Sequence, residues 1–280
     1  MRAARAKVNL WLNVVGRRAD GYHLLDSLVA FADLADMLEA TASDRLTLAV
    51  EGPEAATLAG ESDNLVLRAA RRLADRAGVA PRAALRLTKN IPVAAGLGGG
   101  SADAAAALLA LSALWRVALP VEELFELAAG LGADVPMCLA GRPAIASGVG
   151  ERLDPAPPLP ACGLLLVNPG AALSTPEVFA ARSGGFSSAQ PVVRPWTDFA
   201  GFVEALSLRG NDLEAPAIAL HPAISEVLSV LRGSAGARYA AMSGSGATCF
   251  ALYATLADAH GAAARLPAGW WRHAGTFVSG

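Results

Sequence analysis

Apolar and polar residues alternate in several stretches of the chain, and this pattern predicts β-strands. Residues 5–15 alternate in this way, which places Lys7 and Asn9 on one face of the first strand, because strand side chains repeat every second position. Residues 236–253 predict two strands joined by a second glycine turn, Ser243-Gly244-Ser245-Gly246. The other predicted strands cover residues 24–31, 37–41, 46–50, 85–89 and 162–168.

Helix signals lie between these strands. A helix is predicted up to about Ala77, with Ser62, Asp63 and Asn64 placed to cap its start and Gly78 to end it. The alanine-rich run over residues 101–111 has strongly helix-forming composition. A shorter helix is predicted over residues 120–130, with acidic residues in its first turn.

The order of these elements indicates the fold class. Strands and helices that alternate without strict βαβ spacing predict an α+β fold with largely antiparallel sheets. Residues 132–136 (Gly-Ala-Asp-Val-Pro) are predicted to form a turn, and the prolines of residues 155–160 suggest a domain boundary. We therefore expect two domains, residues 1–155 and residues 156–280.

Composition excludes several classes of protein. Hydrophobic residues make up 54% of the 280 residues, yet the longest apolar stretch, residues 104–115, is too short for the ~20 residues of a membrane span. No signal peptide is apparent at the N-terminus. Three widely spaced cysteines suggest a reduced, cytoplasmic setting without a metal cluster. The net charge of −2 predicts no nucleic-acid-binding face.

Lysine is rare in this chain, which suggests that it is retained for function. Of 23 basic residues, only Lys7 and Lys89 are lysine, and the others are arginine. The two side chains are not interchangeable where a compact ammonium must meet a phosphate or a hydroxyl. Lys7 lies on the first predicted strand, and Lys89 directly precedes a glycine-rich segment.

This glycine-rich segment follows a strand and opens a helix, which is a phosphate-binding arrangement. Four glycines fall within residues 96–100, and glycine lets the backbone adopt positive φ and approach a ligand closely. The free N–H groups of the first helical turn then favour an anion. No lysine follows the glycines, as a nucleotide P-loop requires, and their spacing does not fit the dinucleotide fingerprint.

The remaining pattern, Pro-x-x-x-Gly-Leu-Gly-Gly-Gly-Ser-x-Asp-Ala, resembles the central motif of the GHMP small-molecule kinases. Motifs at residues 6–10, 18–23, 132–136 and 242–248 extend the resemblance over nearly the whole chain, towards the members that act on cytidine-diphosphate methylerythritol. The resemblance implies a two-domain fold with helices packed on one side of the sheets. It also implies transfer of phosphate from ATP, with Mg²⁺, to the 2-hydroxyl of this polyol in the non-mevalonate isoprenoid route.

Site residues follow from the same resemblance. Lys7 and Asp134 are implied as the catalytic pair, the carboxylate accepting the hydroxyl proton. The implied substrate-binding residues are Asn9, Tyr22, His23, Thr175 and Phe179. The implied ATP-binding residues are Pro92, Val93, Ala94, Ala95, Gly96, Leu97, Gly98, Gly99, Gly100, Ser101, Ala102, Asn64 and Lys89. No metal ligand is assigned, because Ala102 stands where the family often has a serine hydroxyl. Ala94 and Ala95 are a second departure, since they replace glycines of some members.

Two other functions stay open at this point. One is another GHMP kinase, for homoserine or a mevalonate-type substrate, and the motif containing Tyr22 and His23 argues against it. The other is a metabolite sensor without activity, which the presence of Lys7 and Asp134 disfavours. The expected partner is a small molecule rather than a nucleic acid or a membrane, and the protein is expected to be a monomer or a homodimer.

Overall fold

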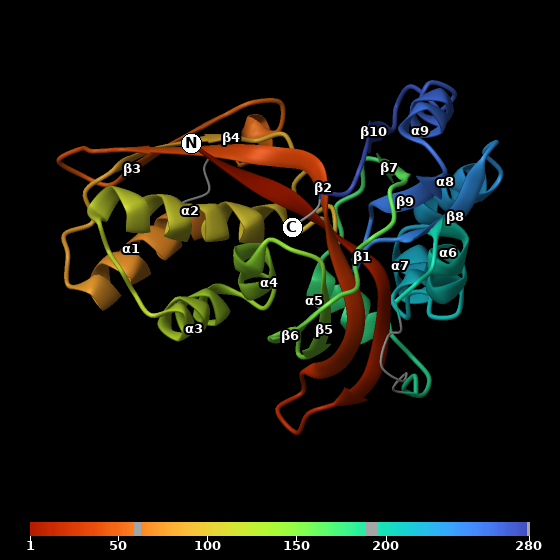
Figure 1. Cartoon of the computed structure of the whole chain (residues 1–280), viewed down its shortest axis with the longest axis horizontal. Helices are drawn as coiled ribbons and strands as arrows, with labels where there is room; N and C mark the ends of the chain where they lie inside the picture. Colours follow the sequence, from red (N-terminus) through yellow and green to blue (C-terminus); the bar gives the residue numbers. More distant parts are fainter. Residues whose placement is uncertain (59–62, 189–194, 279–280) are drawn as a thin grey trace. The chain divides into compact units, whose positions relative to one another are not determined.

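The computed structural model describes residues 1–58, 63–188 and 195–278, and the chain forms two compact units (Figure 1). The first unit consists of Met1–Ala6, Leu34–Val93 and Gly98–Gly141. The second unit consists of Lys7–Asp33, Ala94–Leu97 and Arg142–Gly280. The chain passes between the units several times, and the boundary expected at residues 155 and 156 stays a prediction.

Strands β1 (Arg2–Arg17) and β2 (His23–Thr41) begin the chain. The sequence predicted two strands where β2 is continuous, and this prediction was wrong. Asp33 and Asp36 interrupt the apolar pattern, but each carboxylate accepts hydrogen bonds from the backbone of a distant segment. Thr276 N donates to Asp33 at 3.0 Å, and Ile91 N donates to Asp36 at 2.8 Å. The strand therefore tolerates both acidic residues.

The first unit packs helices on one face of a small sheet (Figure 1). The last residues of β2 pair antiparallel with β4 (Ala84–Thr88), and β3 (Thr47–Glu51) pairs parallel with β4. Leu38, Leu85 and Leu87 of these strands share one apolar core with the helices. The helical elements of this unit are η1 (Ala55–Leu58), α1 (Leu65–Ala77), α2 (Gly99–Trp115), α3 (Val121–Leu131) and α4 (Val135–Ala140).

The ends of α1 and the start of α4 can be compared with the predicted helix limits. Of the three residues predicted to cap α1, Ser62 lies outside the described residues, and Asn64 is the cap, because its side chain accepts a hydrogen bond from Val66 N at 2.9 Å. Gly78 ends the helix with φ of 65°, as predicted. The predicted turn at residues 132–136 was wrong in part, because α4 begins at Val135. Pro136 lies in its first turn, where the missing N–H of proline costs no helical hydrogen bond.

The second unit contains an antiparallel four-stranded sheet in the order β10-β7-β9-β8. Its strands are β7 (Gly163–Asn168), β8 (Ala237–Met242), β9 (Cys249–Tyr253) and β10 (Trp271–Gly275). A second antiparallel arrangement joins the start of β2 to β5 (Ala144–Gly148) and β6 (Arg152–Pro155). The helices are α5 (Thr175–Ala181), α6 (Phe199–Ser207), α7 (Glu214–Leu220), α8 (Ala223–Arg232) and α9 (Leu256–Ala263).

Helices α8 and α9 cover the same face of the four-stranded sheet. Alternate residues of β7 and β9, among them Leu165, Val167 and Ala251, belong to one apolar core with Leu228 and Ala259 of these helices. The α+β class, the mainly antiparallel sheets and the packing of helices on one side are thus confirmed.

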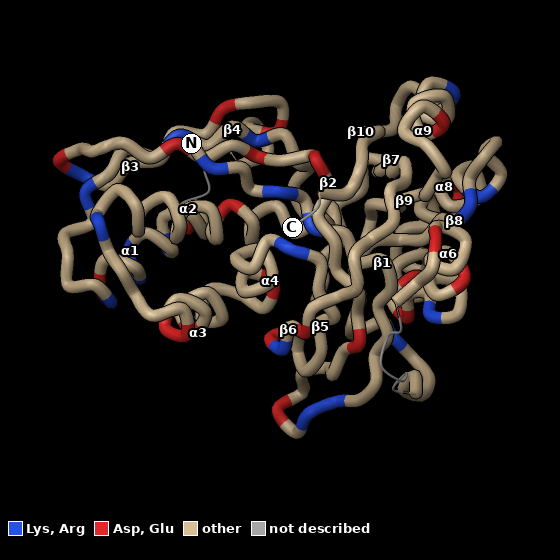
Figure 2. Tube along the Cα trace, in the orientation of Figure 1, with Lys and Arg blue, Asp and Glu red and all other residues tan. Residues whose placement is uncertain are grey.

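Charged positions are spread over the elements of both units, with basic and acidic residues interspersed along the trace (Figure 2). Among the described residues, no helix combines the length and hydropathy that a membrane crossing requires.

Candidate functional site

Lys7 and Asn9 lie side by side on the buried face of β1, as the alternation predicted. Lys7 is only 5% exposed, and its Nζ donates a hydrogen bond to Asn9 Oδ1 at 2.7 Å. Asn9 Nδ2 in turn donates to Ser27 Oγ of β2 at 2.8 Å. Since every link in this chain is buried, the ammonium is held in one place rather than moving through solvent.

The second glycine turn packs directly on this strand. Asn9 N donates to Ser243 Oγ at 3.1 Å, and Ser243 Oγ donates to Gly96 O at 3.2 Å. A Cβ on Gly244 would lie 3.1 Å from Asn9 Oδ1 and 3.8 Å from Lys7 Nζ. The backbone of the turn therefore approaches the Lys7 ammonium as closely as a residue without a side chain allows.

Residues 94–97 of the first glycine loop lie against the same turn. A Cβ on Gly96 would come within 2.6 Å of Gly246 O and 2.7 Å of Ser243 O. The carbonyls of Ala95 and Leu97 accept hydrogen bonds from Thr248 N at 3.1 Å and Lys7 N at 2.8 Å. The structure thus brings together β1, part of the first loop and the second turn within the second unit.

Ala94 departs from the family pattern at a demanding position. Its φ is 54°, in the left-handed region that L-residues other than glycine rarely adopt. The hydrogen bond that Leu173 N donates to Ala94 O, at 3.4 Å, helps hold this conformation. A glycine here, as in some family members, would adopt the same φ without steric cost.

Two further residues of this region were not recognised from the sequence. Asn211 Nδ2 donates to both Met242 O and Gly244 O, each at 2.8 Å, and so fixes the second glycine turn, while Asn211 Oδ1 accepts a local hydrogen bond from Leu213 N at 2.9 Å. Ser27 connects Asn9 to Trp11 O at 2.6 Å. The only signal for Ser27 in the sequence is a hydroxyl within an apolar strand.

The residues expected to bind the second substrate also lie in the second unit. The His23 ring stacks on Phe179 of α5, with 5.0 Å between centroids and 20° between planes. Burial, followed by the charges of Arg17 and Arg182, lowers the pKa of His23, which keeps the imidazole neutral at neutral pH. Tyr22 is 64% exposed beside it, and Thr175 shares a 2.8 Å hydrogen bond with Ser245.

The start of α2, in the first unit, has the features of an anion site. Gly98 occupies the N-cap position with φ of 64°, no side chain caps the helix, and its first turn holds no acidic residue. The first N–H groups of a helix have no intrahelical acceptor, so they and the dipole favour a negative group. A Cβ on Gly100 would meet nothing within 4 Å, so there is open space beside the helix start.

We expect Gly98→Val to abolish ATP binding while the fold is kept. A β-branched side chain resists the left-handed φ of Gly98, and it would occupy space where we expect a phosphate to bind. Isothermal titration calorimetry would measure ATP binding and circular dichroism the fold. Gly269→Val is the matched control, since a Cβ there meets nothing within 4 Å and its φ is not positive. Undiminished ATP binding by natively folded Gly98→Val would refute this location for the phosphates.

Lys89, expected to line the adenosine, lies in a buried ion-pair cluster within the first unit. Its Nζ binds Asp36 Oδ2 and, at 2.8 Å, Asp103 Oδ2, and the three side chains are at most 3% exposed. Burial alone would lower the pKa of Lys89, but Asp103 and Asp36 outweigh this and raise it. For Asp103, burial dominates and raises the pKa to about 7. A role of Lys89 in nucleotide binding stays a prediction.

The raised pKa of Asp103 makes stability depend on pH. Because the folded state holds the Asp103 proton more tightly than the unfolded chain, this stabilisation is full below about pH 4 and is lost as the pH rises through 7. Asp103→Asn removes the effect. We therefore expect the unfolding free energy of the variant, measured by urea denaturation, to increase relative to that of the parent as the pH is raised from 5 to 8. A constant difference across this range would contradict the assignment.

Asp134 is half-buried and occupies the N-cap position of α4, where its side chain accepts no capping hydrogen bond. A helix-capping hydrogen bond therefore does not explain why a carboxylate occupies this position. Asp134 belongs to the first unit and Lys7 to the second, and their joint role in catalysis stays a prediction.

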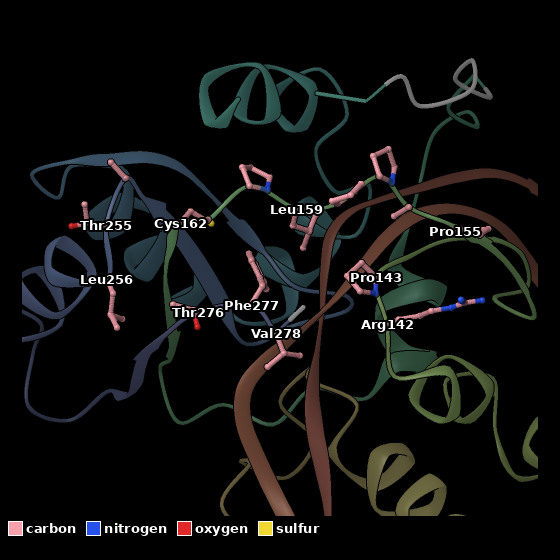
Figure 3. A pocket seen from close by; sticks show the side chains of 16 residues that line it. Arg142, Pro143, Pro155, Leu159, Cys162, Thr255, Leu256, Thr276, Phe277 and Val278 are labelled. Atoms are coloured by element: carbon pink, nitrogen blue, oxygen red, sulfur yellow. The ribbon is translucent and has the colours of Figure 1, made fainter. Parts of the chain in front are cut away.

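A cavity of about 850 Å³ lies in the second unit (Figure 3). The proline-rich segment over residues 155–161 lines it, as do Arg142, Leu256 and Phe277. No residue that the sequence analysis assigned to a site is among those that line it. The prolines expected to mark a boundary therefore also shape a surface cavity.

The fold, the residues around Lys7 and the start of α2 together define a class of protein. A strand-held ammonium beside a glycine turn and a glycine-capped helix start are suited to phosphoryl transfer, which depends on positioning and on stabilisation of phosphate charge. Residues 64–142 match the model of the N-terminal domain of GHMP kinases, and residues 194–270 match the GHMP kinase C-terminal model. A solved homoserine kinase from Cytophaga hutchinsonii, 18% identical over 99% of this chain and 94% of its own, has the same fold with a TM-score of 0.72.

More similar proteins narrow the assignment. A relative from Rhodospirillum rubrum named 4-diphosphocytidyl-2-C-methyl-D-erythritol kinase is 54% identical over 99% of this chain and 92% of its own. A relative of the same name from Paramagnetospirillum magneticum is 55% identical over 96% and 95%. A solved kinase of this kind, 40% identical, covers 100% of this chain and 99% of its own, with a TM-score of 0.82. The chain belongs to the GHMP kinases, in the family of 4-diphosphocytidyl-2-C-methyl-D-erythritol kinases.

Proposed function

We propose that this enzyme transfers the γ-phosphoryl group of ATP to the 2-hydroxyl of 4-diphosphocytidyl-2-C-methyl-D-erythritol, giving the 2-phosphate and ADP in the non-mevalonate isoprenoid pathway. The observation that carries the proposal is identity above 50%, over nearly the whole chain, with relatives named for this substrate. The site is consistent with it, because the Lys7 ammonium is held by Asn9 beside the second glycine turn and the His23 ring stacks on Phe179.

Lys7 and Asp134 are the proposed catalytic residues. The transition state of phosphoryl transfer is loose, so orientation and charge stabilisation dominate catalysis. The Lys7 ammonium, fixed by Asn9, would stabilise charge on the attacking oxygen and the transferring phosphoryl group. The Asp134 carboxylate would accept the proton of the hydroxyl. Asn9 would orient the polyol beside Lys7.

The ATP phosphates would lie at the start of α2. The residues from Pro92 to Ala102 supply glycines and backbone N–H groups suited to an anion. Asn64 would lie towards the nucleoside. Mg²⁺ would neutralise phosphate charge when it binds with ATP. Mg²⁺ usually keeps several waters and binds through substrate phosphates, so the ATP phosphates and water would supply most of its ligands.

Cytosine would be recognised by Tyr22, His23 and Phe179, with Thr175 near the polyol. We expect Tyr22→Ala to weaken binding of the cytidine substrate by about ten- to a hundredfold, since base stacking is worth roughly 1–3 kcal/mol. Tyr22→Phe keeps the ring and serves as the matched control. The KM of each substrate would be measured in turn. A raised KM for ATP with an unchanged KM for the cytidine substrate would reverse the assignment of the two nucleotide sites.

A phosphorylation screen tests the proposed function itself. The enzyme would be incubated with ATP, Mg²⁺ and either cytidine-diphosphate methylerythritol, mevalonate or homoserine, and ADP formation would be followed. We expect turnover with the first compound only. Preferred turnover of mevalonate or homoserine would refute the substrate assignment, and ATP binding without turnover of any of the three would support a sensor.

A further inference from the structure

The cluster of Lys89, Asp36 and Asp103 lies at both ends of the glycine-rich loop. Lys89 directly follows β4, and Asp103 lies in the second turn of α2. Asp36 Oδ1 accepts hydrogen bonds from Asn90 N at 2.5 Å and Ile91 N at 2.8 Å. The cluster therefore joins the end of β4 to α2, and the residues from Pro92 to Gly98 are the segment of chain that connects them.

The backbone of Lys89 is held as firmly as its ammonium. Lys89 N donates to Glu51 O at 2.7 Å, and Lys89 O accepts from Glu54 N at 3.2 Å. Gly52, with φ of 97°, allows this approach, because a Cβ there would lie 2.7 Å from Lys89 O. Both ends of the Lys89 side chain are thus fixed by the first unit.

The ammonium also lies directly behind the helix start. A Cβ on Gly99 would be 3.1 Å from Lys89 Nζ and 3.2 Å from Ile91 Cγ2, so glycine is needed for the helix to sit this close. A buried ion pair contributes little net stability, because desolvation opposes the Coulombic attraction. Its strict geometry is better suited to fixing one arrangement of the chain.

We propose that Lys89, Asp36 and Asp103 are positioning residues for ATP binding, in which the ammonium joins the end of β4 to α2 and so fixes the loop that receives the phosphates. Lys89 then acts through the two carboxylates rather than by contact with the nucleotide. This inference rests on the proposed use of ATP. It adds a role for Asp36 and Asp103, and it replaces the direct contact expected of Lys89.

Asp103 Oδ1 supports this interpretation. It is buried and has no hydrogen-bond partner among the described residues, so only Oδ2 links Asp103 to the cluster. Replacing Asp103 by leucine removes this single link and preserves much of the volume. Replacing it by asparagine keeps an oxygen that can accept from Lys89. The pair of variants separates loss of the link from loss of charge.

The test measures binding of a non-hydrolysable ATP analogue by calorimetry. We expect Lys89→Met and Asp103→Leu each to weaken binding by about tenfold or more, because a misplaced loop loses its contacts. The double variant should bind ATP no more weakly than either single variant, since each single variant already breaks the Lys89–Asp103 ion pair that joins β4 to α2. Asp103→Asn should recover most of the affinity. In steady-state assays, the KM for ATP should rise while kcat at saturating ATP stays within about threefold.

Leu73→Ala, in the core of the same unit, is the control for stability, because it creates a cavity without touching the cluster. It should lower the melting temperature and leave ATP affinity unchanged. A large effect of Lys89→Met with none of Asp103→Leu would show that Lys89 contacts the nucleotide directly and would overturn the proposal. Additive effects, or normal affinity in both variants, would also overturn it. Absence of analogue binding by the parent enzyme would instead refute the proposed use of ATP.

Discussion

Asp134→Asn is expected to lower kcat by roughly 10²–10⁴-fold while ATP affinity changes little, because the amide cannot accept the proton of the substrate hydroxyl. The side chain keeps its size, so the start of α4 should be unaffected. Single-turnover kinetics would report the chemical step, and calorimetry would report ATP binding.

Asp154→Asn is the matched control, since this exposed carboxylate of β6 carries no proposed role. It should retain full activity. Near-normal turnover by Asp134→Asn would remove the general base from the proposed mechanism. Loss of ATP affinity equal to the loss of turnover would place Asp134 in nucleotide binding instead.

Lys7→Arg is expected to reduce kcat by about a hundredfold or more, close to the loss caused by Lys7→Met. The guanidinium is planar and larger than the ammonium, while Lys7 is buried and its Nζ lies between Asn9 and the backbone of Gly244. The position of the charge, and not its presence alone, should therefore determine activity.

Arg5→Met, at an exposed position of the same strand, controls for a change of charge near Lys7 and should leave kcat unchanged. Melting temperatures would identify any loss of folding in the Lys7 variants. Retention of most activity by Lys7→Arg, together with its loss in Lys7→Met, would show that any positive charge is sufficient.

Much of the fold was predictable because local rules decide it. The alternation in β1, the Asn64 cap and the glycine that ends α1 act within a few residues of sequence. The continuity of β2 was not predictable, since Asp36 is stabilised by Asn90 and Ile91, more than fifty positions away. Strands β5, β6 and β10 and helices α6 to α9 were also not identified, because their periodic patterns are short.

The candidate site divides in the same way. The glycine loops were recognisable because several glycines are clustered within a few residues, and Lys7 was recognisable because lysine is rare in this chain. The burial of Lys89 between two carboxylates was not predictable, because Asp36 and Asp103 are distant in sequence and meet Lys89 only in the folded chain. The two hydrogen bonds that Asn211 donates were not predictable for the same reason, since Met242 and Gly244 lie more than thirty positions further along the sequence.

The most direct test of the proposed function is ³¹P NMR of the reaction with ATP and cytidine-diphosphate methylerythritol. C2 of the polyol carries a methyl group and no hydrogen, so a phosphate ester at C2 has no proton three bonds from phosphorus. The proposed function predicts one new phosphomonoester resonance without proton splitting, formed in equal amount to ADP. A new resonance split by carbinol protons, or ADP formed together with inorganic phosphate alone, would contradict it.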